Sequence, residues 1–182
     1  STSAASVGAP TALLYRMASN LLIDQARSAQ RSSRRNAQWR LDTRLVQGGY
    51  EAFGRGDMAA LAEMMADDIE WVSPGDPDDN PNAGTFKGKE AVLGWFGGLA
   101  STVDFATFEP REFIAQNDKV VSLVYAEATV RDTGRAFVSH EAQVWTFRDG
   151  KLARFQNYLD TAAADAAHRA DSTAQCWSGW LT

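Results

Sequence analysis

Four long segments in the second half of the chain alternate apolar and polar side chains, and short turns join them. The alternation has a period of two, which is the spacing of side chains on the two faces of a β-strand. Strands joined by tight turns are antiparallel neighbours, so this half predicts an antiparallel sheet. The expected strands span residues 105–116, 120–131, 135–147 and 152–159. The turn pairs are Asn117-Asp118, Thr133-Gly134 and Asp149-Gly150.

The residues before this expected sheet show helical spacing instead. Apolar side chains three and four residues apart predict helices over residues 42–53, 58–65 and 88–99. Residues 69–72 predict a short strand. Residues 73–84 are rich in Pro, Asp, Asn and Gly, which predicts a long solvated loop of the kind that often forms a lid. Helices grouped before strands are typical of an α+β fold.

Two aspartates stand where further helices are expected to begin. Asp57 precedes the short helix, and Asp160 precedes an Ala-rich stretch that starts at Thr161. A carboxylate at this position accepts a hydrogen bond from the first turn of a helix, so both residues are predicted N-caps.

The first 44 residues differ from the rest in charge. They carry seven arginines against two aspartates, a net +5, which leaves about −10 for the remainder of a chain whose total is −5. An apolar helical stripe after Pro10 runs into a basic, polar stretch that predicts a solvated helix end or linker. We therefore expect an N-terminal basic segment over residues 1–40, a folded domain over 41–170 and a tail over 171–182. The acidic domain is a poor candidate for nucleic-acid binding because phosphates repel it.

Composition excludes several other classes. The chain has 182 residues and lacks the roughly 20 consecutive apolar residues that cross a bilayer, so no membrane span is expected. Cys176 is the single cysteine, which excludes an intramolecular disulfide and favours a cytoplasmic setting. His140 and His168 are the two histidines and give no metal-site pattern, so neither a metal nor a cofactor is expected.

Five local sequences, in this order and spacing, resemble the SnoaL-like, ketosteroid-isomerase-like superfamily of the nuclear-transport-factor fold. The resemblance covers residues 42–170 and implies a cone-shaped, curved antiparallel sheet wrapped around N-terminal helices, with one central pocket. It also implies a homodimer, here through the outer sheet face, and activity as an isomerase, cyclase, hydrolase or ligand-binding domain. The sequences are Tyr50-Glu-Ala-Phe-Gly-Arg-Gly-Asp57, Met65-Ala-Asp-Asp-Ile-Glu-Trp71, Gly84-Thr-Phe-Lys-Gly-Lys89, Val144-Trp-Thr-Phe-Arg-Asp-Gly-Lys-Leu152 and Tyr158-Leu-Asp160.

Residues 10–35 have a second resemblance. The run from Ala12 to Arg27 resembles the end of the second conserved region of an extracytoplasmic-function sigma factor, where this helix contacts promoter DNA. Some such factors carry a SnoaL-like domain as a regulatory module, although the rest of the sigma-factor pattern is absent here. The resemblance implies nucleic-acid contact within residues 10–40, with arginines as the phosphate ligands. The candidates are Arg27, Arg31, Arg34 and Arg35.

Resemblance to the ketosteroid isomerases decides which side chains line the pocket. It places Gln143 where those enzymes hold a protonated carboxylic acid, Tyr50 on their oxyanion-stabilising tyrosine and Ser73 on their proton-shuttling carboxylate. Serine is no base at neutral pH without an activating partner, so the ketosteroid isomerase mechanism does not transfer. Strand parity puts Glu141 on the face of Gln143 and His140 on the opposite face. The expected pocket residues are Tyr50, Trp71, Ser73, Trp95, Ala126, Ala128, Glu141, Gln143, Trp145, Phe155 and Asn157.

The leading hypothesis is a pocket protein for a small apolar ligand, aromatic or polycyclic. If it is an enzyme, we expect cofactor-free isomerisation, cyclisation or hydrolysis, with Glu141, Tyr50 and Gln143 as catalytic candidates. Desolvation in an apolar cavity would make Glu141 a usable acid or base, whereas a basic partner or a place at the rim would not. The alternatives are a regulatory module of a sigma-factor-like protein and a structural dimer with a vestigial pocket.

Overall fold

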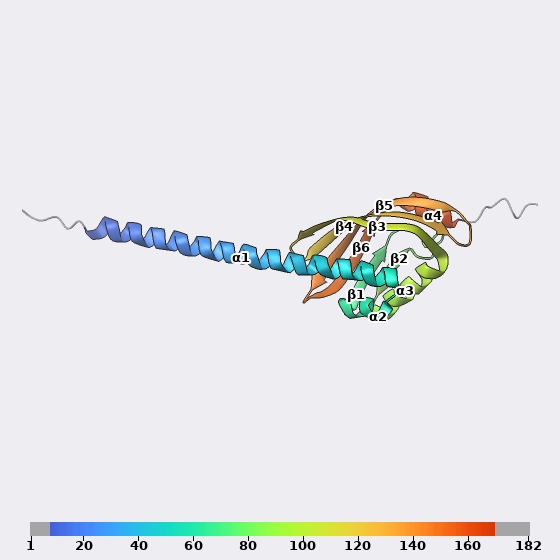
Figure 1. The fold of residues 1–182 in the computed structure, drawn as a ribbon, viewed down its shortest axis with the longest axis horizontal. Coiled ribbons are helices and arrows are strands. Elements are labelled where there is room, and N and C mark those ends of the chain that lie inside the picture. The colour runs from blue at the N-terminus through green and yellow to red at the C-terminus, as the bar shows by residue number, and fades with distance from the viewer. Residues whose placement is uncertain (1–7, 170–182) are drawn as a thin grey trace, which may run out of the picture.

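The computed structural model describes the backbone of residues 8–169 and the side chains of residues 27–169. Within these residues, four helices and six strands follow one another, and the sheet curls around the helices (Figure 1). The helices are α1 (Gly8–Arg55), α2 (Met58–Met64), α3 (Lys89–Thr102) and α4 (Thr161–His168). The strands are β1 (Met65–Ser73), β2 (Gly84–Lys87), β3 (Val103–Gln116), β4 (Lys119–Val130), β5 (Ala136–Arg148) and β6 (Lys151–Tyr158).

Strands β3 to β6 form the predicted antiparallel meander, which confirms the α+β fold. Their turns use the left-handed backbone region, with φ of 56° at Asn117, 67° at Gly134 and 52° at Asp149. Asn, Asp and Gly adopt that region at the lowest cost, so these residues fix where each strand ends. The β4–β5 pairing runs without a bulge from Lys119 opposite Thr146 to Thr129 opposite Ala136.

The sheet as a whole is mixed, with the order β2-β1-β6-β5-β4-β3. Strand β1 pairs with β6 in parallel, and β2 adds an antiparallel edge strand that was not predicted. The expectation of a wholly antiparallel sheet is therefore wrong at this end. No turn links β1 to β6, so nothing local in the sequence specifies their pairing or its direction.

The N-terminal segment is one uninterrupted helix rather than a helix, a linker and a second helix. Helix α1 has 48 residues, and its first part projects away from the domain while its last turns pack on the sheet (Figure 1). The basic stretch does not break it because the chain has neither Gly nor Pro between Pro10 and Gly48. A run of charge solvates a helix, whereas ending one requires a breaker or a cap.

The core lies between the inner face of the sheet and the last turns of α1, α2 and α3. It is built from fully buried aliphatic residues such as Val46, Ile69 and Val92, each worth about 1.5–3 kcal/mol by burial. The predicted caps are confirmed, because Asp57 Oδ1 accepts from Ala60 N at 3.0 Å and Asp160 Oδ1 likewise caps α4. Within residues 8–169, no helix combines the length and the apolar character needed to cross a membrane.

Candidate functional site

A cavity of about 110 Å³ lies between the inner sheet face and the helices. Its wall is mainly apolar and rich in aromatic rings, and Trp71 stacks on Phe155 with ring centroids 3.7 Å apart. The residues come from every layer of the domain, from α1 to α4, so the complete fold is needed to form the wall. The expected residues that border the cavity are Tyr50, Trp71, Ser73, Trp95, Glu141, Gln143, Trp145, Phe155 and Asn157.

Two other expected residues, Ala126 and Ala128, are buried in β4 but are not part of the wall. Phe108 and Phe105 on β3 pair with them in the sheet, and both of these rings border the cavity. An alanine side chain is too short to reach past such neighbours. Strand parity predicted the correct side of the sheet for both alanines, but it carries no information on how far each side chain extends.

A polar network begins with three side chains that meet inside the domain, and two of them, Tyr50 and Trp145, border the cavity. Trp145 Nε1 donates to Ser122 Oγ at 2.8 Å, and Ser122 Oγ lies 2.5 Å from the Tyr50 hydroxyl oxygen. The single proton of Tyr50 is donated onward to Gln143 Oε1 at 2.6 Å, so Ser122 donates to Tyr50. Each donor in this series of hydrogen bonds therefore points toward Gln143.

The chain of hydrogen bonds ends on Glu141. Gln143 Nε2 donates to Glu141 Oε2 at 2.7 Å, and Asn157 Nδ2 donates to the same oxygen at 2.8 Å. These residues lie on neighbouring strands, because Gln143 of β5 is paired with Asn157 of β6. The carboxylate is thus held in one place by two neutral amides.

Burial raises the pKa of Tyr50 well above its usual range. The hydrogen bonds from Ser122 and Trp145 act in the opposite direction, and the nearby charge of Glu141 raises the pKa further. Burial dominates because an ionised phenol loses its hydration in the apolar cavity. Tyr50 is therefore a protonated donor at neutral pH.

No lysine or arginine stands on the cavity wall among the described residues, and no described cation forms an ion pair with Glu141. The alternative in which a basic group neutralises this carboxylate is not met in that part of the chain. Glu141 is half-buried and also borders a surface groove next to Leu123 and Tyr158. It therefore stands between the cavity and the solvent.

His140 lies on the outer face of the sheet, opposite in parity to Gln143, as predicted. It is exposed, and its ring centroid is 5.2 Å from that of Tyr125. This position separates His140 from the cavity, so it takes no part in the site.

One rim of the cavity comes from elements that sequence reasoning did not assign to it. The loop between β1 and β2 is exposed at residues 75–78, yet Asn80 and Asn82 are buried and border the cavity. Asn82 holds the loop to α3, because its carbonyl oxygen accepts from Trp95 Nε1 at 2.8 Å. The sequence predicts a solvated loop, whereas its first part is exposed and its second part holds buried residues.

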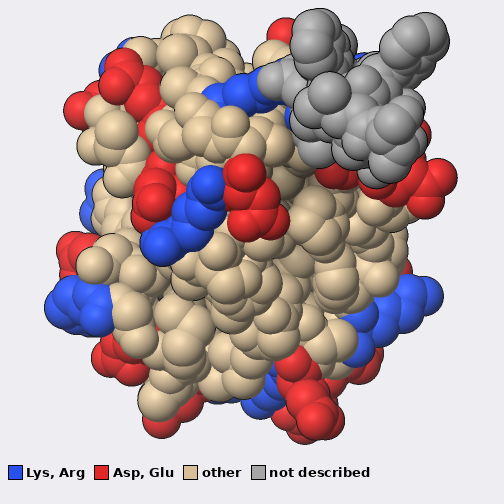
Figure 2. All heavy atoms as spheres, turned by 90° about the vertical axis from the view of Figure 1, so that its right-hand side faces the viewer, with Lys and Arg blue, Asp and Glu red and all other residues tan. Residues whose placement is uncertain are grey.

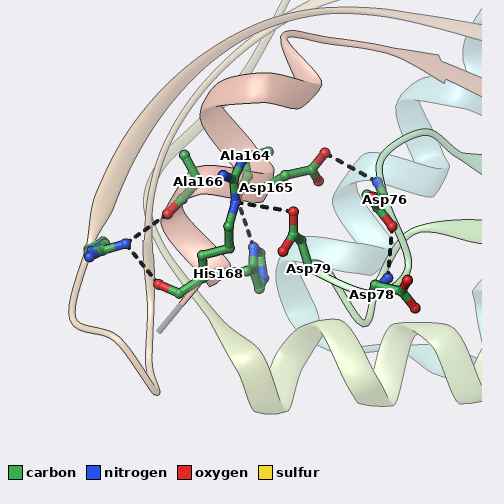
Figure 3. Close-up of polar contacts among 9 residues, drawn as sticks. Asp76, Asp78, Asp79, Ala164, Asp165, Ala166 and His168 are labelled. Carbon is green, nitrogen blue, oxygen red and sulfur yellow. Dashed lines mark hydrogen bonds and ion pairs between the residues drawn. The ribbon is translucent and has the colours of Figure 1, made fainter. Parts of the chain in front are cut away.

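Helix α4 completes this rim and is tied to the same loop. Asp165 Oδ2 accepts from the backbone N–H of Asp76 at 3.2 Å, and Arg169 Nε lies 3.1 Å from Asp79 Oδ2 (Figure 3). His168, the last residue of α4, borders the cavity. Figure 2 views the side of the molecule that lies at the right of Figure 1. Charged residues of both signs are scattered over this side and do not collect into one patch.

A curved six-stranded mixed sheet that packs on N-terminal helices and encloses an apolar cavity is the NTF2-like fold, also seen in ketosteroid-isomerase-like proteins. Residues 46–155 match the model of the SnoaL-like domain, and the chain belongs to this family. The match begins after residues 10–35 and gives no support to their sigma-factor resemblance. The uncharacterized protein Rv0034 of Mycobacterium tuberculosis is 31% identical over 127 residues, which are 69% of this chain and 94% of that protein.

Solved structures agree with this assignment. An NTF2-like protein from Burkholderia xenovorans is similar with a TM-score of 0.67 and 31% identity, over 72% of this chain and 98% of that one. TerC co-crystallized with polyporic acid is similar with a TM-score of 0.63 and 26% identity, over 70% of this chain and 97% of that one.

Proposed function

We propose that the protein binds a small aromatic compound in this cavity and catalyses a cofactor-free proton transfer next to a carbonyl group, as an isomerase or cyclase would. The observation that carries this proposal is Glu141, a carboxylate held by two amides on a wall that is mainly apolar and has no other carboxylate among the described residues. Such a group can accept and return a proton without a counter-charge to neutralise it.

The volume of the cavity favours a ligand of about one aromatic ring. A cavity of about 110 Å³ is close in size to an engineered cavity of about 150 Å³ that takes up benzene. A polycyclic ligand would have to separate Trp71 from Phe155 or move Trp95. TerC, which shares the fold, holds a small organic molecule, and this supports a similar use of the cavity here.

The proposed chemistry follows from where the donors and acceptors lie. Glu141 removes a proton from the carbon next to the carbonyl, and the electron pair of that C–H bond forms the double bond of an enolate. Tyr50, which stays protonated, turns its hydroxyl from Gln143 to the enolate oxygen and stabilises the developing charge. Gln143 and Asn157 hold the carboxyl group while it carries the proton. Return of that proton to carbon completes the cycle.

Hydrogen–deuterium exchange of acetophenone in D₂O tests the proposal, because proton removal from its methyl group is visible by proton NMR. We expect the wild-type chain to accelerate the exchange and Glu141→Gln to reduce it about 100-fold or more. Glu112→Gln is the matched control, since Glu112 is an exposed residue of β3. Exchange that survives in Glu141→Gln at the wild-type rate would remove this residue from the mechanism.

A second candidate function is regulation through contact with nucleic acid, and the exposed part of α1 favours it. Arg27, Arg31, Arg34 and Arg35 are exposed, and their spacing places them on one side of the helix. A basic stripe of this kind suits phosphate groups. A DNA mobility shift that weakens with salt and is lost when all four become Gln would support it. Absence of a shift at low salt would reject it.

We also propose that two copies pair through the outer sheet face. Leu123, Ala142 and Tyr158 lie side by side across β4, β5 and β6. Leu123 is 38% exposed and Tyr158 is 57% exposed, so an apolar row faces the solvent in the single chain. A second sheet packed on this row would remove it from water.

A further inference from the structure

His168 borders the cavity and has one ring nitrogen engaged and one buried without a partner among the described residues. Its Nδ1 lies 3.0 Å from the backbone carbonyl oxygen of Ala164. A carbonyl oxygen only accepts hydrogen bonds, so Nδ1 carries the proton in this contact. In the neutral ring, Nε2 then bears the lone pair and is an acceptor.

Nε2 is buried and has no hydrogen-bond partner among the described residues. A buried polar atom without a partner is costly and is rare in folded proteins. The polar atoms in the same condition on this wall are Trp71 Nε1, which is a donor, and Asn157 Oδ1, which is an acceptor. Three residues that border the cavity therefore carry a polar atom without a partner, and these atoms are two acceptors and one donor.

The position of His168 is fixed by bonds on both sides of α4. Thr133 Oγ1 donates to Ala167 O at 2.6 Å, and Arg135 Nη1 donates to Ala166 O at 3.0 Å. Asp165 binds the loop at Asp76, and Figure 3 shows the imidazole below α4, near Asp79. A side chain held in this way keeps its direction without a ligand, which lowers the cost of binding one.

We propose that His168 Nε2 accepts a hydrogen bond from a hydroxyl group of the ligand, which is a neutral phenol or enol. This rests on the proposed function, because it names the ligand of the same cavity. The hydroxyl supplies the donor that Nε2 lacks. A carboxylate is disfavoured because it brings no donor, because Glu141 stands on the same wall, and because no described wall residue is Lys or Arg.

Binding of three one-ring probes to the full chain tests the proposal: p-cresol, toluene and benzoate, each measured by titration calorimetry. We expect p-cresol to bind about tenfold more tightly than toluene, as one buried hydrogen bond predicts, and benzoate to bind most weakly. In His168→Phe the advantage of p-cresol over toluene should disappear while toluene still binds. His140→Phe is the matched control, since His140 lies outside the cavity, and it should keep the wild-type order.

Two results would overturn the proposal. The first is equal binding of p-cresol and toluene to the wild type; the second is a p-cresol advantage that persists in His168→Phe. Binding of none of the probes would instead reject the proposed function itself, so the two failures are distinguishable. Nitrogen-15 NMR of the imidazole gives a second readout that does not depend on the variant. The Nε2 resonance should shift when p-cresol is added and stay in place with toluene.

Discussion

Asp165 leaves no room for a side chain on Gly75. A Cβ atom on this glycine would lie 2.7 Å from Asp165 Oδ1 and 3.1 Å from Ala83 Cβ. The φ of Gly75 is 138°, a conformation that other residues rarely adopt. The loop from β1 can therefore approach α4 only because residue 75 lacks a side chain, and the Asp76–Asp165 hydrogen bond depends on that approach.

Gly75→Ala is expected to lower the free energy of unfolding by about 1–3 kcal/mol, because it adds both backbone strain and a clash. Thermal unfolding measures the loss. Gly94→Ala is the matched control, since nothing lies within 4 Å of its Cβ position in α3 and alanine favours a helix. Equal melting temperatures for Gly75→Ala and the wild type would contradict the close approach.

Removing the ring stacked on Trp71 should be among the most damaging single changes. Phe155 is 3% exposed, so Phe155→Ala is expected to cost about 3–5 kcal/mol through lost burial and the space it leaves. Denaturant unfolding checks this. Leu41→Ala serves for comparison, because Leu41 is 54% exposed and its loss should change stability by about 0.5 kcal/mol or less. Similar midpoints for the two variants would argue against the stacked core.

Tyr50 should make stability fall at alkaline pH. Its pKa in the folded chain is raised by burial, whereas in the unfolded chain it is about 10. Above pH 10 the unfolded chain therefore releases a proton that the folded chain keeps, and stability decreases as the pH rises. Unfolding curves from pH 8 to 11.5 should show this decline, and Tyr50→Phe should reduce it. The same decline in Tyr50→Phe would assign it to other groups.

Leu123→Lys tests the pairing of two copies through the outer sheet face. A lysine at the β4 end of the apolar row would bury an unpaired charge in the interface, so the variant should be a monomer while the wild type sediments as a dimer. Sedimentation equilibrium gives both masses. Leu41→Lys, a leucine-to-lysine change at an exposed position on α1, should leave the dimer intact. A wild-type chain that sediments as a monomer would end the proposal.

The parts of the fold that the sequence predicts are those specified locally. The meander follows from side-chain alternation and from turn residues such as Asn117 and Gly134, whose own backbone conformation ends each strand. The parallel pairing of β1 with β6 depends on residues about 80 positions apart, and no local pattern marks it. The arginine-rich stretch of α1 predicts a helix end or linker, yet the helix continues through it because nothing in it breaks a helix.

The site was predictable to a similar extent. Parity, together with the family resemblance, selected the face that carries Glu141 and Gln143, but the hydrogen bond from Asn157 to Glu141 depends on the register of β6. The sequence gives no signal for His168, because this residue ends a short Ala-rich helix. The place of that helix is set by Thr133 and Arg135, which lie in the turn between β4 and β5. Its one sequence clue is the cap at Asp160, which fixes where that helix begins.

The unbroken backbone of α1 also has a mechanical consequence. From Gly8 to Arg40 the helix rises about 50 Å at 1.5 Å per residue. A molecule that binds the far end of α1 is therefore kept at a distance from the cavity. One continuous helix nevertheless joins that molecule to the turn that carries Tyr50.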